Sequence, residues 1–590
     1  MIEISSRNDK ESYIRYTGTS MDEYYKFTEI LGEIQNKYYD YNYGLWICDA
    51  ISAQKIQDKL NNIHIGERLK LSPYDYQRQA IAYCLSNSGG LLTLPCGAGK
   101  TPIGLGVFDE LIKCNKIQPI GVFVVKASLK TQWLKEVSKF TNYSAKVVNT
   151  FKAETSKISN RIRSKEKQIK SLSKKDAFEH SKEINILTKE CDDLRQEAEQ
   201  VFVGGFDPKK YQVFIINYET LADDKVRECL HQLKPDFFYV DEADCIKDPS
   251  TKRSKNLREF ISAKYKYGAT ATPIRKNPKD LYGIFSFILP SLFPSERDFD
   301  NRFLKKWYGR VTGSKNEEEL SRIIKPHCFS RTYEQIADQL PQQTIVQMYC
   351  ELTPKQIEMT KYLMELKDEA TSKMEALAMR LPPNMLETNA EYQTQKGLVS
   401  AYQTFAQELA DDERLLKQSE SNMAHKFITG ASSSKLNLCM ELVQKIIDSN
   451  EKVVIFSKYI PMQDFIIERL QKLKDINEYS WLQWSQIYGA ISDQKRAEVL
   501  DTYNNTNEQR VLLLSDAGEA GLNLSTTKYM IEFELADSAA KQTQRHGRTR
   551  RADSIHKNLF VYQLIAQESY DEIAQMIVNK KTKYSQEILK

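Results

Sequence analysis

The sequence lacks the features that would place the protein in a membrane or cross-link it. No run approaches the roughly eighteen apolar residues of a membrane span, and the mean hydropathy is −0.54. The ten cysteines form no Cys-x-x-Cys pair, and the seven histidines do not cluster beside them. Reduced thiols are therefore favoured over a structural zinc site or a disulfide framework. The first residues lack a signal-peptide pattern, so we expect a cytoplasmic protein with no membrane partner; a nuclear location stays open.

Length and charge set only broad limits. A chain of 590 residues is too long for one hydrophobic core, and its apolar fraction of 41% is enough for several. The net charge of +5 permits nucleic-acid binding. It does not indicate such binding, because a solvated surface of mixed charge gives the same total.

Short apolar runs alternate with amphipathic segments from about residue 69 onward. Each run is followed closely by turn or charged residues, which is typical of strands in a parallel sheet that is covered on both faces. The alternation of such strands with helices predicts α/β lobes. The predicted strands are Leu91–Leu94, Gly121–Val125, Val213–Ile216, Phe237–Val240, Val453–Phe456 and Val511–Leu514.

Two helix-prone stretches interrupt this alternation, at 152–203 and at 355–430. In the first, apolar residues recur at heptad spacing and predict an antiparallel helical hairpin inserted into the first lobe. The hairpin is either a plain spacer or a functional element. The second stretch separates the two lobes. The heptad positions of the first stretch are Ile184, Leu187, Cys191, Leu194, Ala198 and Val201.

A glycine-rich turn follows the first predicted strand and precedes a helix. Gly97 and Gly99 let backbone amides wrap a phosphate at the helix N-terminus. Lys100 is then expected to reach the β- and γ-phosphates of ATP, and Thr101 to ligate Mg²⁺. Leu94 stands where the strict P-loop pattern has glycine, so a glycine-rich turn without this function is the alternative. The predicted nucleotide-binding residues of this segment are Pro95, Cys96, Gly97, Ala98, Gly99, Lys100 and Thr101.

Two adjacent carboxylates follow the predicted strand Phe237–Val240. Asp241 is expected to hold Mg²⁺ through water, and Glu242 to polarise the water that attacks the nucleotide. An ordinary loop or a helix N-cap is the alternative for an isolated pair of this kind. The glycine-rich turn upstream and the segment 269–273 downstream favour the catalytic interpretation.

Tyr76 and Gln77 lie upstream of Lys100, at the start of an amphipathic stretch. A glutamine amide can pair with both N6 and N7 of adenine. We therefore expect this pair to contact the base and Gln77 to select ATP, although a lone glutamine is more often an ordinary surface residue.

These elements, together with others in the same order, resemble superfamily 2 helicases and more narrowly the SWI/SNF-type double-stranded DNA translocases. The resemblance covers roughly residues 70–590 and implies two RecA-like lobes that close on ATP and Mg²⁺. The further matching segments are 124–136, 216–221, 244–250 and 272–290 in the first half, and 434–436, 454–457, 515–524, 544–551 and 561–572 in the second.

The resemblance implies further site residues. Arg548 and Arg551 match arginine fingers, three residues apart and so on one helical face. Gly521 and Gln544 match nucleotide-binding positions. The implied contacts to nucleic-acid phosphates, which carry no sequence information, are Lys126, Ser128, Tyr218, Thr220, Ser457 and Asn523.

The N-terminal residues 37–46 are rich in tyrosine and contain Trp46. They resemble the HARP domain of annealing helicases, which implies recognition of branched or forked DNA. Aromatic residues also favour strands, so a small β-core without a role in DNA binding is the alternative.

The predicted fold is therefore α/β, with two tandem RecA-like P-loop lobes, helical insertions and a small N-terminal domain. We expect an accessory domain at 1–68, a first lobe at 69–295, a linker with a helical insertion at 296–430, and a second lobe with a C-terminal brace at 431–590. The predicted protein is a DNA-stimulated ATP hydrolase that translocates on duplex or forked DNA without sequence preference.

Two other functions stay open from the sequence. A strand-separating helicase acting on DNA or RNA is favoured by Asp244, where the SWI/SNF-type family usually has histidine, and by the 545–548 segment. An idle nucleic-acid-binding scaffold is the other, and the intact set of predicted catalytic residues argues against it.

Overall fold

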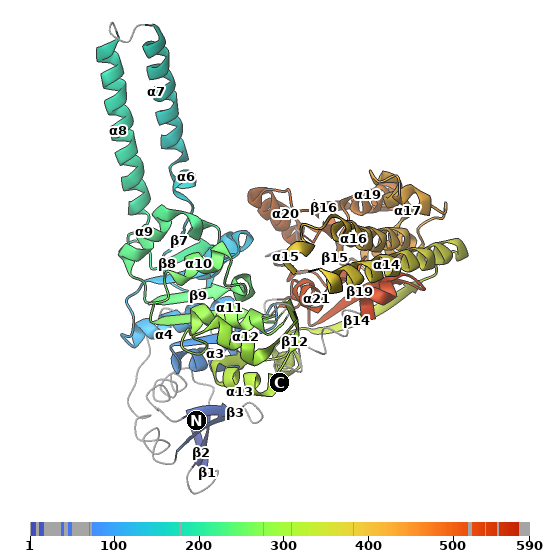
Figure 1. Ribbon diagram of the computed structural model, residues 1–590, viewed down its shortest axis with the longest axis horizontal. Coiled ribbons are helices and arrows are strands. Elements are labelled where there is room, and N and C mark those ends of the chain that lie inside the picture. The colour runs from blue at the N-terminus through green and yellow to red at the C-terminus, as the bar shows by residue number, and fades with distance from the viewer. Residues whose placement is uncertain are drawn as a thin grey trace. The chain divides into compact units, whose positions relative to one another are not determined.

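The computed structural model describes residues 2–6, 11–16, 37–40, 45–49, 70, 73–175, 180–274, 277–307, 310–381, 383–516, 522–536, 538–551 and 554–576 (Figure 1). The chain forms two compact units. The first comprises residues 1–94, 99–299 and 322–331, and the second comprises 95–98, 300–321 and 332–590. Each contains a parallel sheet of its own, which confirms the predicted α/β fold with two lobes.

The first unit is built on a seven-stranded sheet of order β13-β5-β10-β9-β6-β8-β7, in which the paired strands run parallel. Its five longest strands are buried along their whole length, as strands covered on both faces must be. The strands are β5 (Gly89–Thr93), β6 (Gly121–Val125), β7 (Ala145–Val147), β8 (Val213–Asn217), β9 (Phe237–Asp241), β10 (Tyr265–Thr270) and β13 (Cys328–Ser330).

Aromatic rings fill the core between this sheet and its helices. The rings of Phe108 and Phe237 lie 5.3 Å apart, and those of Phe123 and Trp133 also lie 5.3 Å apart. A Cβ atom at Gly104 would come within 2.9 Å of the Tyr239 ring, so glycine lets α4 approach β9 closely. The helices along this part of the chain are α3 (Asp75–Leu85), α4 (Lys100–Lys113), α5 (Lys130–Phe140), α9 (Asp224–Leu233), α10 (Lys252–Arg258), α11 (Lys279–Ile288), α12 (Glu296–Phe303) and α13 (Glu317–Ile324).

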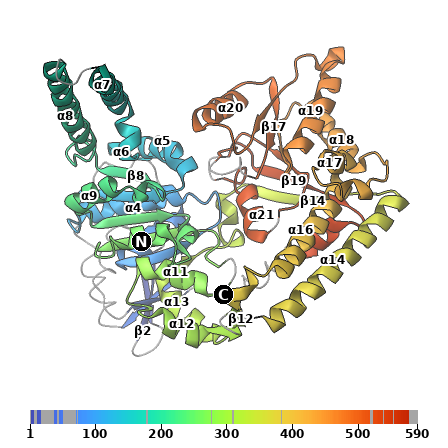
Figure 2. The same ribbon diagram turned by 45° about the horizontal axis from the view of Figure 1, so that its top comes forward.

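A helical hairpin projects from the first unit (Figures 1 and 2). A short helix, α6 (Phe151–Glu154), leads into α7 (Ser156–Lys175), and α8 (Ser181–Gly204) packs alongside α7. The buried positions of α8 are Cys191, Leu194, Ala198 and Phe202. Val201 was expected to continue this seam, but it is 53% exposed. The buried seam continues at Phe202, four residues after Ala198, rather than at Val201. An α-helix has 3.6 residues per turn, so an exact seven-residue repeat gradually rotates around its surface.

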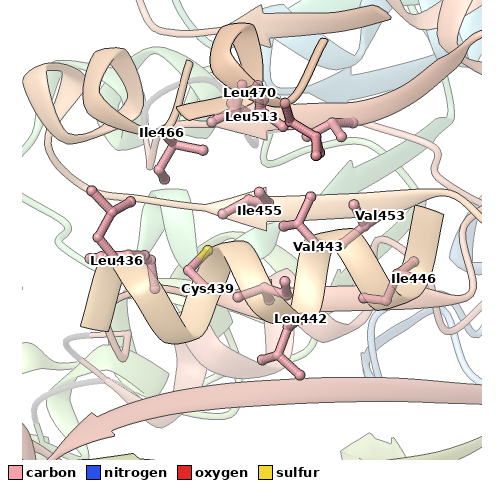
Figure 3. Packing of buried hydrophobic residues seen from close by; sticks show 14 of the residues in the cluster. Leu436, Cys439, Leu442, Val443, Ile446, Val453, Ile455, Ile466, Leu470 and Leu513 are labelled. Carbon is pink, nitrogen blue, oxygen red and sulfur yellow. The ribbon is translucent and has the colours of Figure 1, made fainter. Parts of the chain in front are cut away.

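The second unit is built on a six-stranded parallel sheet of order β14-β19-β18-β15-β17-β16. The helix α18 (Ser434–Asp448) packs Leu436, Cys439 and Val443 toward Ile455 of β15 and Ile466 of α19 (Figure 3). The remaining elements of this lobe are α19 (Ile460–Lys474), α20 (Asp493–Asn505) and α21 (Ala539–His546), with β14 (Gln342–Cys350), β15 (Val453–Phe456), β16 (Gln483–Ile487), β17 (Gln509–Leu514), β18 (Tyr529–Glu532) and β19 (Asn558–Ala566).

The helices of the expected linker belong to this second unit. Leu363, Phe405 and Leu409 share one buried cluster with Phe427 and with Tyr570 near the C-terminal end of the described chain. These elements are α14 (Pro354–Arg380), α15 (Pro383–Leu386), α16 (Ala390–Asp411) and α17 (Glu413–Gln418).

The lobe boundaries differ from those expected. Strand β13 lies beyond residue 295 yet joins the first sheet, and β14 precedes the linker helices yet pairs with β19 in the second. The expected brace segment 561–564 lies inside β19, which has strand neighbours on both sides. Because β14 is an edge strand that alternates exposed and half-buried residues, it does not form the continuous apolar run by which the central strands were recognised.

Most of the predicted N-terminal domain lies outside the described residues. Its described part is an antiparallel sheet of order β1-β2-β4-β3, formed by β1 (Ile2–Ser6), β2 (Glu11–Tyr16), β3 (Lys37–Asp40) and β4 (Leu45–Asp49). Elsewhere β11 (Leu304–Trp307) and β12 (Arg310–Ser314) form a two-stranded ribbon. Among the helices that the structure describes, none combines the length and apolar character that crossing a membrane requires.

Candidate nucleotide-binding site

The glycine-rich turn joins the carboxyl end of β5 to the first residue of α4. Gly97 has φ +80° and Gly99, the N-cap residue of α4, has φ +69°. Backbone in this region is readily adopted by glycine and strained for other residues. The turn therefore brings backbone amides and the positive end of a helix together, an arrangement that binds phosphate.

Lys100 and Thr101 occupy the first turn of α4. The Lys100 ammonium donates a hydrogen bond of 3.4 Å to the carbonyl of Leu94, so its side chain folds back along the turn. The Lys100 carbonyl accepts from the Tyr239 hydroxyl at 2.8 Å, which ties the start of α4 to strand β9. Thr101 is buried next to it.

Asp241 and Glu242 lie at the carboxyl end of β9, on the same edge of the sheet as the glycine-rich turn. Trp133 donates its indole N–H to Asp241 Oδ2 at 3.0 Å, and the backbone N–H of Glu242 donates to Asp241 Oδ1 at 3.0 Å. The Tyr218 hydroxyl lies 2.6 Å from the Asp241 carbonyl oxygen and 3.2 Å from that of Glu242. Several elements thus fix the Asp241 carboxylate and the backbone of both residues.

The backbone of Glu242 has φ +51°, a left-handed conformation that is unfavourable for glutamate. Such strain persists only where the surroundings impose it, and it gathers at functional sites. The bonds from Tyr218 supply that constraint.

This carboxylate pair is electrostatically unfavourable without a cation. Burial raises the pKa of Asp241 and the neighbouring Glu242 carboxylate raises it further, whereas the Lys100 ammonium lowers it. The Lys126 ammonium lies 3.6 Å from Glu242 Oε2. A divalent cation at this position would relieve the repulsion, so the donor set fits Mg²⁺.

No group of three or more histidine, cysteine or acidic side chains that could hold a metal occurs in the described parts of the chain. A cation at Thr101 and Asp241 would therefore need ligands from a bound phosphate, as Mg²⁺ in phosphoryl-transfer sites usually has.

Asp244 connects the carboxylate loop to the next strand. The Thr270 hydroxyl donates to Asp244 Oδ1 at 3.2 Å, and both residues are buried. The Thr272 hydroxyl, two residues further along, is a buried polar atom for which the described residues provide no hydrogen-bond partner. A movement of the loop that carries Asp241 and Glu242 would therefore be transmitted through Asp244 to the segment 270–272.

Gln77 lies close to the turn but has a structural role. Its Oε1 accepts from the backbone N–H of Tyr74 at 3.0 Å and forms a capping box at the start of α3. Its Nε2 would clash with a Cβ atom placed on Gly99, and Tyr76 is buried beside it. The adenine contact expected of Tyr76 and Gln77 stays a prediction.

In the second unit, the arginines of the 544–551 segment have different roles. Arg545 is 1% exposed, donates to the Glu534 carbonyl at 3.0 Å, and pairs with Asp516 and Glu532. Arg550 packs 4.2 Å from the centre of the Tyr333 ring and donates to the Pro341 carbonyl at 3.0 Å. These two arginines hold the segment in place.

Gln544 and Arg548 are different, because each has a buried nitrogen that no described residue satisfies. The atoms are Gln544 Nε2 and Arg548 Nε. Buried donors without partners are costly and therefore unusual in a folded protein. Both residues were predicted from the sequence to face the nucleotide. Arg551 is half-buried, and the predicted Gly521 lies outside the described residues.

The six predicted phosphate contacts fall into two groups. Tyr218, Thr220 and Ser457 are buried, and their hydroxyls already bond to backbone carbonyls, to Asn217 and to Glu534. Direct contact of these three with a nucleic acid would break those bonds, so the structure argues against them. The other three predicted residues, Lys126, Ser128 and Asn523, are partly exposed.

A buried ionic cluster joins three elements of the second unit. The Lys435 ammonium, at the start of α18, lies 2.7 Å from Asp411 Oδ1 and 2.7 Å from Asp571 Oδ2. All three side chains are at most 1% exposed. Gln407 donates to Asp411 at 3.1 Å and to Asp571 at 2.8 Å. The sequence did not predict this cluster, because its members lie far apart in the chain.

Comparison with known proteins places the chain in a family. Residues 76–397, more than half of the chain, match the model of the SNF2-related domain. The chain belongs to the SNF2-related family. Residues 434–553 of this SNF2-related protein match the Helicase conserved C-terminal domain. The first match extends past the first unit into the helices α14 and α16 of the second, and the second match ends before β19.

Relatives of this SNF2-related protein are larger. An uncharacterized ATP-dependent helicase of Mycoplasma pneumoniae is 22% identical over 538 residues, which is 89% of this chain and 43% of that protein. The ISWI chromatin-remodeling complex ATPase ISW2 of Saccharomyces cerevisiae is 24% identical over 373 residues, or 62% of this chain and 30% of that protein. The chain thus spans less than half the length of these relatives.

Two solved structures are also similar. The Sulfolobus solfataricus SWI2/SNF2 ATPase core in complex with dsDNA has 21% identity and a TM-score of 0.36, covering 90% of this chain and 95% of that one. The Pyrococcus furiosus Hef helicase domain has 15% identity and a TM-score of 0.49, covering 86% and 98%. Because these TM-scores are below 0.5, the fold assignment rests on the family match and on the two parallel sheets.

Proposed function

We propose that this protein is a Mg²⁺-dependent ATP hydrolase that nucleic acid stimulates and that translocates on duplex or forked DNA. The observation that carries the proposal is the buried Asp241–Glu242 pair, held in a strained conformation on the same sheet edge as the glycine-rich turn and Lys100. Family membership and relatives named as ATP-dependent helicases support it.

The glycine-rich turn, the start of α4 and the end of β9 together fit a nucleoside triphosphate with its metal. The amides around Gly97 and Gly99 bind phosphate oxygens, and Lys100 neutralises charge on the β- and γ-phosphates. Thr101 and Asp241 hold Mg²⁺. Bound Mg²⁺·ATP supplies the transferable phosphoryl group, with part of its negative charge neutralised by the metal.

Glu242 orients the attacking water and accepts its proton at a carboxylate oxygen. The constrained backbone at Glu242 and the bond from Trp133 to Asp241 keep the two carboxylates from exchanging places. Lys126 lies beside Glu242, at the end of β6 where nucleic acid is expected to bind. A phosphate of the nucleic acid bound to Lys126 would therefore affect the position of Glu242 and of the water that it orients.

Arg548 and Arg551 stabilise the charge that develops on the phosphoryl oxygens, and Gln544 assists in binding the nucleotide. The unsatisfied buried nitrogens of Gln544 and Arg548 support this assignment, because an anion would satisfy them.

The polymer is duplex or forked DNA, recognised through its phosphates and without sequence preference. A relative in Caenorhabditis elegans, 24% identical over 379 residues, is named a chromodomain-helicase-DNA-binding protein homolog, which supports DNA rather than RNA. Lys126, Ser128 and Asn523 are the partly exposed candidates for phosphate contact.

ATP hydrolysis measured in parallel with duplex DNA, forked DNA, single-stranded DNA and RNA tests the proposal. Stimulation by duplex or forked DNA, without release of a labelled strand, supports a translocase. Stimulation by RNA alone overturns the choice of DNA. Strand release favours the strand-separating helicase, and hydrolysis that no polymer changes overturns the motor.

Fork recognition by the N-terminal domain is a separate question. Trp46 is buried against Tyr39, with ring centres 5.2 Å apart, so this pair packs within the small sheet rather than facing unpaired bases. Deleting residues 1–68 should abolish any preference for forked DNA if the HARP-like interpretation is right, while the basal ATPase rate is retained. An unchanged preference rejects that interpretation.

A further inference from the structure

The two helices of the projecting hairpin differ in charge. Helix α7 carries eight lysines and arginines and one glutamate, whereas α8 carries three lysines and arginines and six acidic residues. The net charge of +5 for the whole chain conceals this concentration of positive charge on one helix.

Some cations of α7 form ion pairs with acidic residues of α8 within the hairpin. Arg161 lies 3.6 Å from Glu197 of α8, and Lys165 pairs with Glu190. The one acid of α7, Glu166, pairs with Arg195 of α8 at 2.8 Å. These pairs flank the apolar seam and hold the two helices together.

Four other cations form a stripe on the opposite side of α7. Arg163, Lys167, Lys170 and Lys174 follow one another at spacings of four, three and four residues, which places them on one helical face. All four are exposed, and none forms an ion pair with any residue that the structure describes. At 1.5 Å per residue the stripe is about 16 Å long. We call it the α7 stripe.

Helix stability does not explain the α7 stripe. Lysine and arginine three or four residues apart repel one another and destabilise the helix. Ser164 and Ser171 lie near the stripe, and the one acid beside it, Glu166, pairs with Arg195 of α8. A row of cations that has no acidic partner in the described chain suits an external polyanion.

The base of the hairpin is fixed to the first sheet. The ring of Phe202 lies 5.1 Å from that of Phe151 and 5.5 Å from that of Phe206, which in turn stacks at 5.9 Å on Phe214 of β8. The backbone N–H of Phe151 donates to Asp223 at 2.7 Å. The hairpin is therefore rooted in the sheet and holds the α7 stripe in a defined direction.

The hairpin also begins at the edge of the sheet where nucleic acid is expected. Helices α6 and α7 follow the carboxyl end of β7, and Lys126 follows the carboxyl end of the parallel strand β6. Lys130, at the start of α5, donates to Asn149 at 3.0 Å and so joins this edge to the base of the hairpin.

We propose that the α7 stripe binds the phosphate backbone of the duplex DNA on which the motor acts. This inference rests on the proposed function and extends it from the sheet edge to the hairpin. The four cations displace condensed counterions from the duplex, so their contribution is independent of sequence and falls steeply with salt. The hairpin then works as a second point of attachment beside the translocating lobe.

Neutralising the stripe in the full chain tests the proposal. The variant carries Arg163→Gln, Lys167→Gln, Lys170→Gln and Lys174→Gln, and glutamine preserves helix propensity. The probe is a fluorescent blunt-ended duplex of random sequence, titrated over a series of salt concentrations. The slope of log affinity against log salt should shrink by about 0.9 for each lost contact, or by roughly 3 to 4 in total. The ATPase rate without DNA should not change.

A pair of variants matched in charge separates the stripe from a general charge effect. Arg163→Gln with Lys167→Gln should lower the slope by about 2, whereas Lys182→Gln with Lys189→Gln on α8 should leave it unchanged. Both pairs remove two positive charges from exposed positions of the same hairpin. Circular dichroism should show equal helix content in both.

The outcomes distinguish this inference from the proposed function. Suppose that duplex DNA stimulates the wild-type ATPase but the fourfold variant keeps the wild-type salt slope. The proposal that the α7 stripe binds DNA is then wrong, and the proposed ATPase function is retained. An equal fall of the salt slope in the α8 control variant also overturns the proposal that the α7 stripe binds DNA. If the wild-type chain neither binds duplex DNA nor is stimulated by it, both proposals fail. Binding to vesicles of anionic lipid that depends on the stripe, with an unchanged duplex slope, also overturns it.

Discussion

Both units bury charged side chains near the ends of their parallel sheets, but they balance them differently. In the first unit, Asp241 and Glu242 are adjacent like charges on a strained backbone, and burial raises the pKa of Asp241. In the second, Lys435 lies between Asp411 and Asp571, with Gln407 bonded to both acids. Each site has more acids than cations, but the contacts differ: Lys435 lies 2.7 Å from both of its acids, whereas Lys126 lies 3.6 Å from Glu242. The loosely compensated pair is suited to bind an ion, whereas the directly paired cluster is suited to hold elements together.

The same contrast exists among the arginines of the second unit. Arg545 and Arg550 have protein partners, and Arg548 has a buried nitrogen without one among the described residues. Buried charge that the protein satisfies contributes to structure. Buried charge that it leaves unsatisfied marks the place where a ligand is expected.

The sharpest test of this contrast is Arg548→Ala. We expect kcat of the nucleic-acid-stimulated ATPase to fall by about 10³ or more, as for arginine fingers of other NTPases, with ATP binding largely intact. Arg550→Ala is the matched control, because it removes the contact with Tyr333 and should lower stability more than kcat. Steady-state kinetics measure kcat, and titration with a fluorescent ATP analogue measures ATP binding. An unchanged kcat removes Arg548 from this role.

Breaking the buried Lys435 cluster should have a large effect on stability. Lys435→Met leaves Asp411 and Asp571 buried without their cation, which costs about 3–5 kcal/mol. Lys472→Met, which removes the exposed pair between Lys472 and Glu468, should cost less than about 1 kcal/mol. Urea unfolding monitored by circular dichroism compares the two. Equal losses would show that the cluster contributes no more than a surface pair.

The pH dependence of stability should reveal another buried charge of the second unit. Burial favours the neutral form of Glu532, but the opposing effects of His546, Arg545 and Gln563 lower its pKa to about 2. A folded pKa below the unfolded value of about 4.3 means that this carboxylate stabilises the protein above about pH 4.3. That contribution, of order 3 kcal/mol, is lost as pH falls toward 2.

Glu532→Gln tests this assignment. The difference in unfolding free energy between wild type and variant should be constant near neutral pH and shrink steadily from about pH 5 downward. Urea titrations over that range measure it. A difference that stays constant to about pH 3 would show that Glu532 is not the titrating group.

The smallest expected effect concerns the positioning of the Asp241–Glu242 pair. Trp133→Phe keeps an aromatic ring but removes the hydrogen bond to Asp241, and should lower kcat about tenfold. Phe123→Leu alters the same aromatic core without touching Asp241, so it should lower stability with little change in kcat. If the two variants reduce kcat equally, Trp133 acts through packing alone.

The sequence predicted those central strands that are continuous apolar runs, whereas β10, β18 and β19, which also have strand neighbours on both sides, were not predicted. All six predicted runs overlap strands, although Leu94 lies just beyond the end of β5, and the turn after β5 places Lys100 at the start of a helix as expected. Strands at the sheet edges were missed, among them β14, because alternating exposure breaks the apolar run. The missed β14 explains why the second lobe was expected to begin only at 431, and β13, which has only three residues, was too short to be recognised beyond 295.

The site was predicted in part. Motif order selected Lys100, Asp241 and Arg548 as candidates, and the structure places Lys100 and Asp241 at the same edge of one sheet. The role of Trp133 was missed because its partner Asp241 is 108 residues away. Tyr218 was expected to face a phosphate, but its hydroxyl bonds inward to the carboxylate loop, which the sequence alone does not show.

By itself the sequence determined the fold class, the family resemblance and the residue types available for nucleotide chemistry, because these depend on periodicity and on short motifs. Only the tertiary structure decided which charges are balanced, which hydroxyls are buried, and which cations of α7 face away from α8. Those properties depend on contacts between residues distant in the chain, and burial changes the energy of a charge far more than sequence position does.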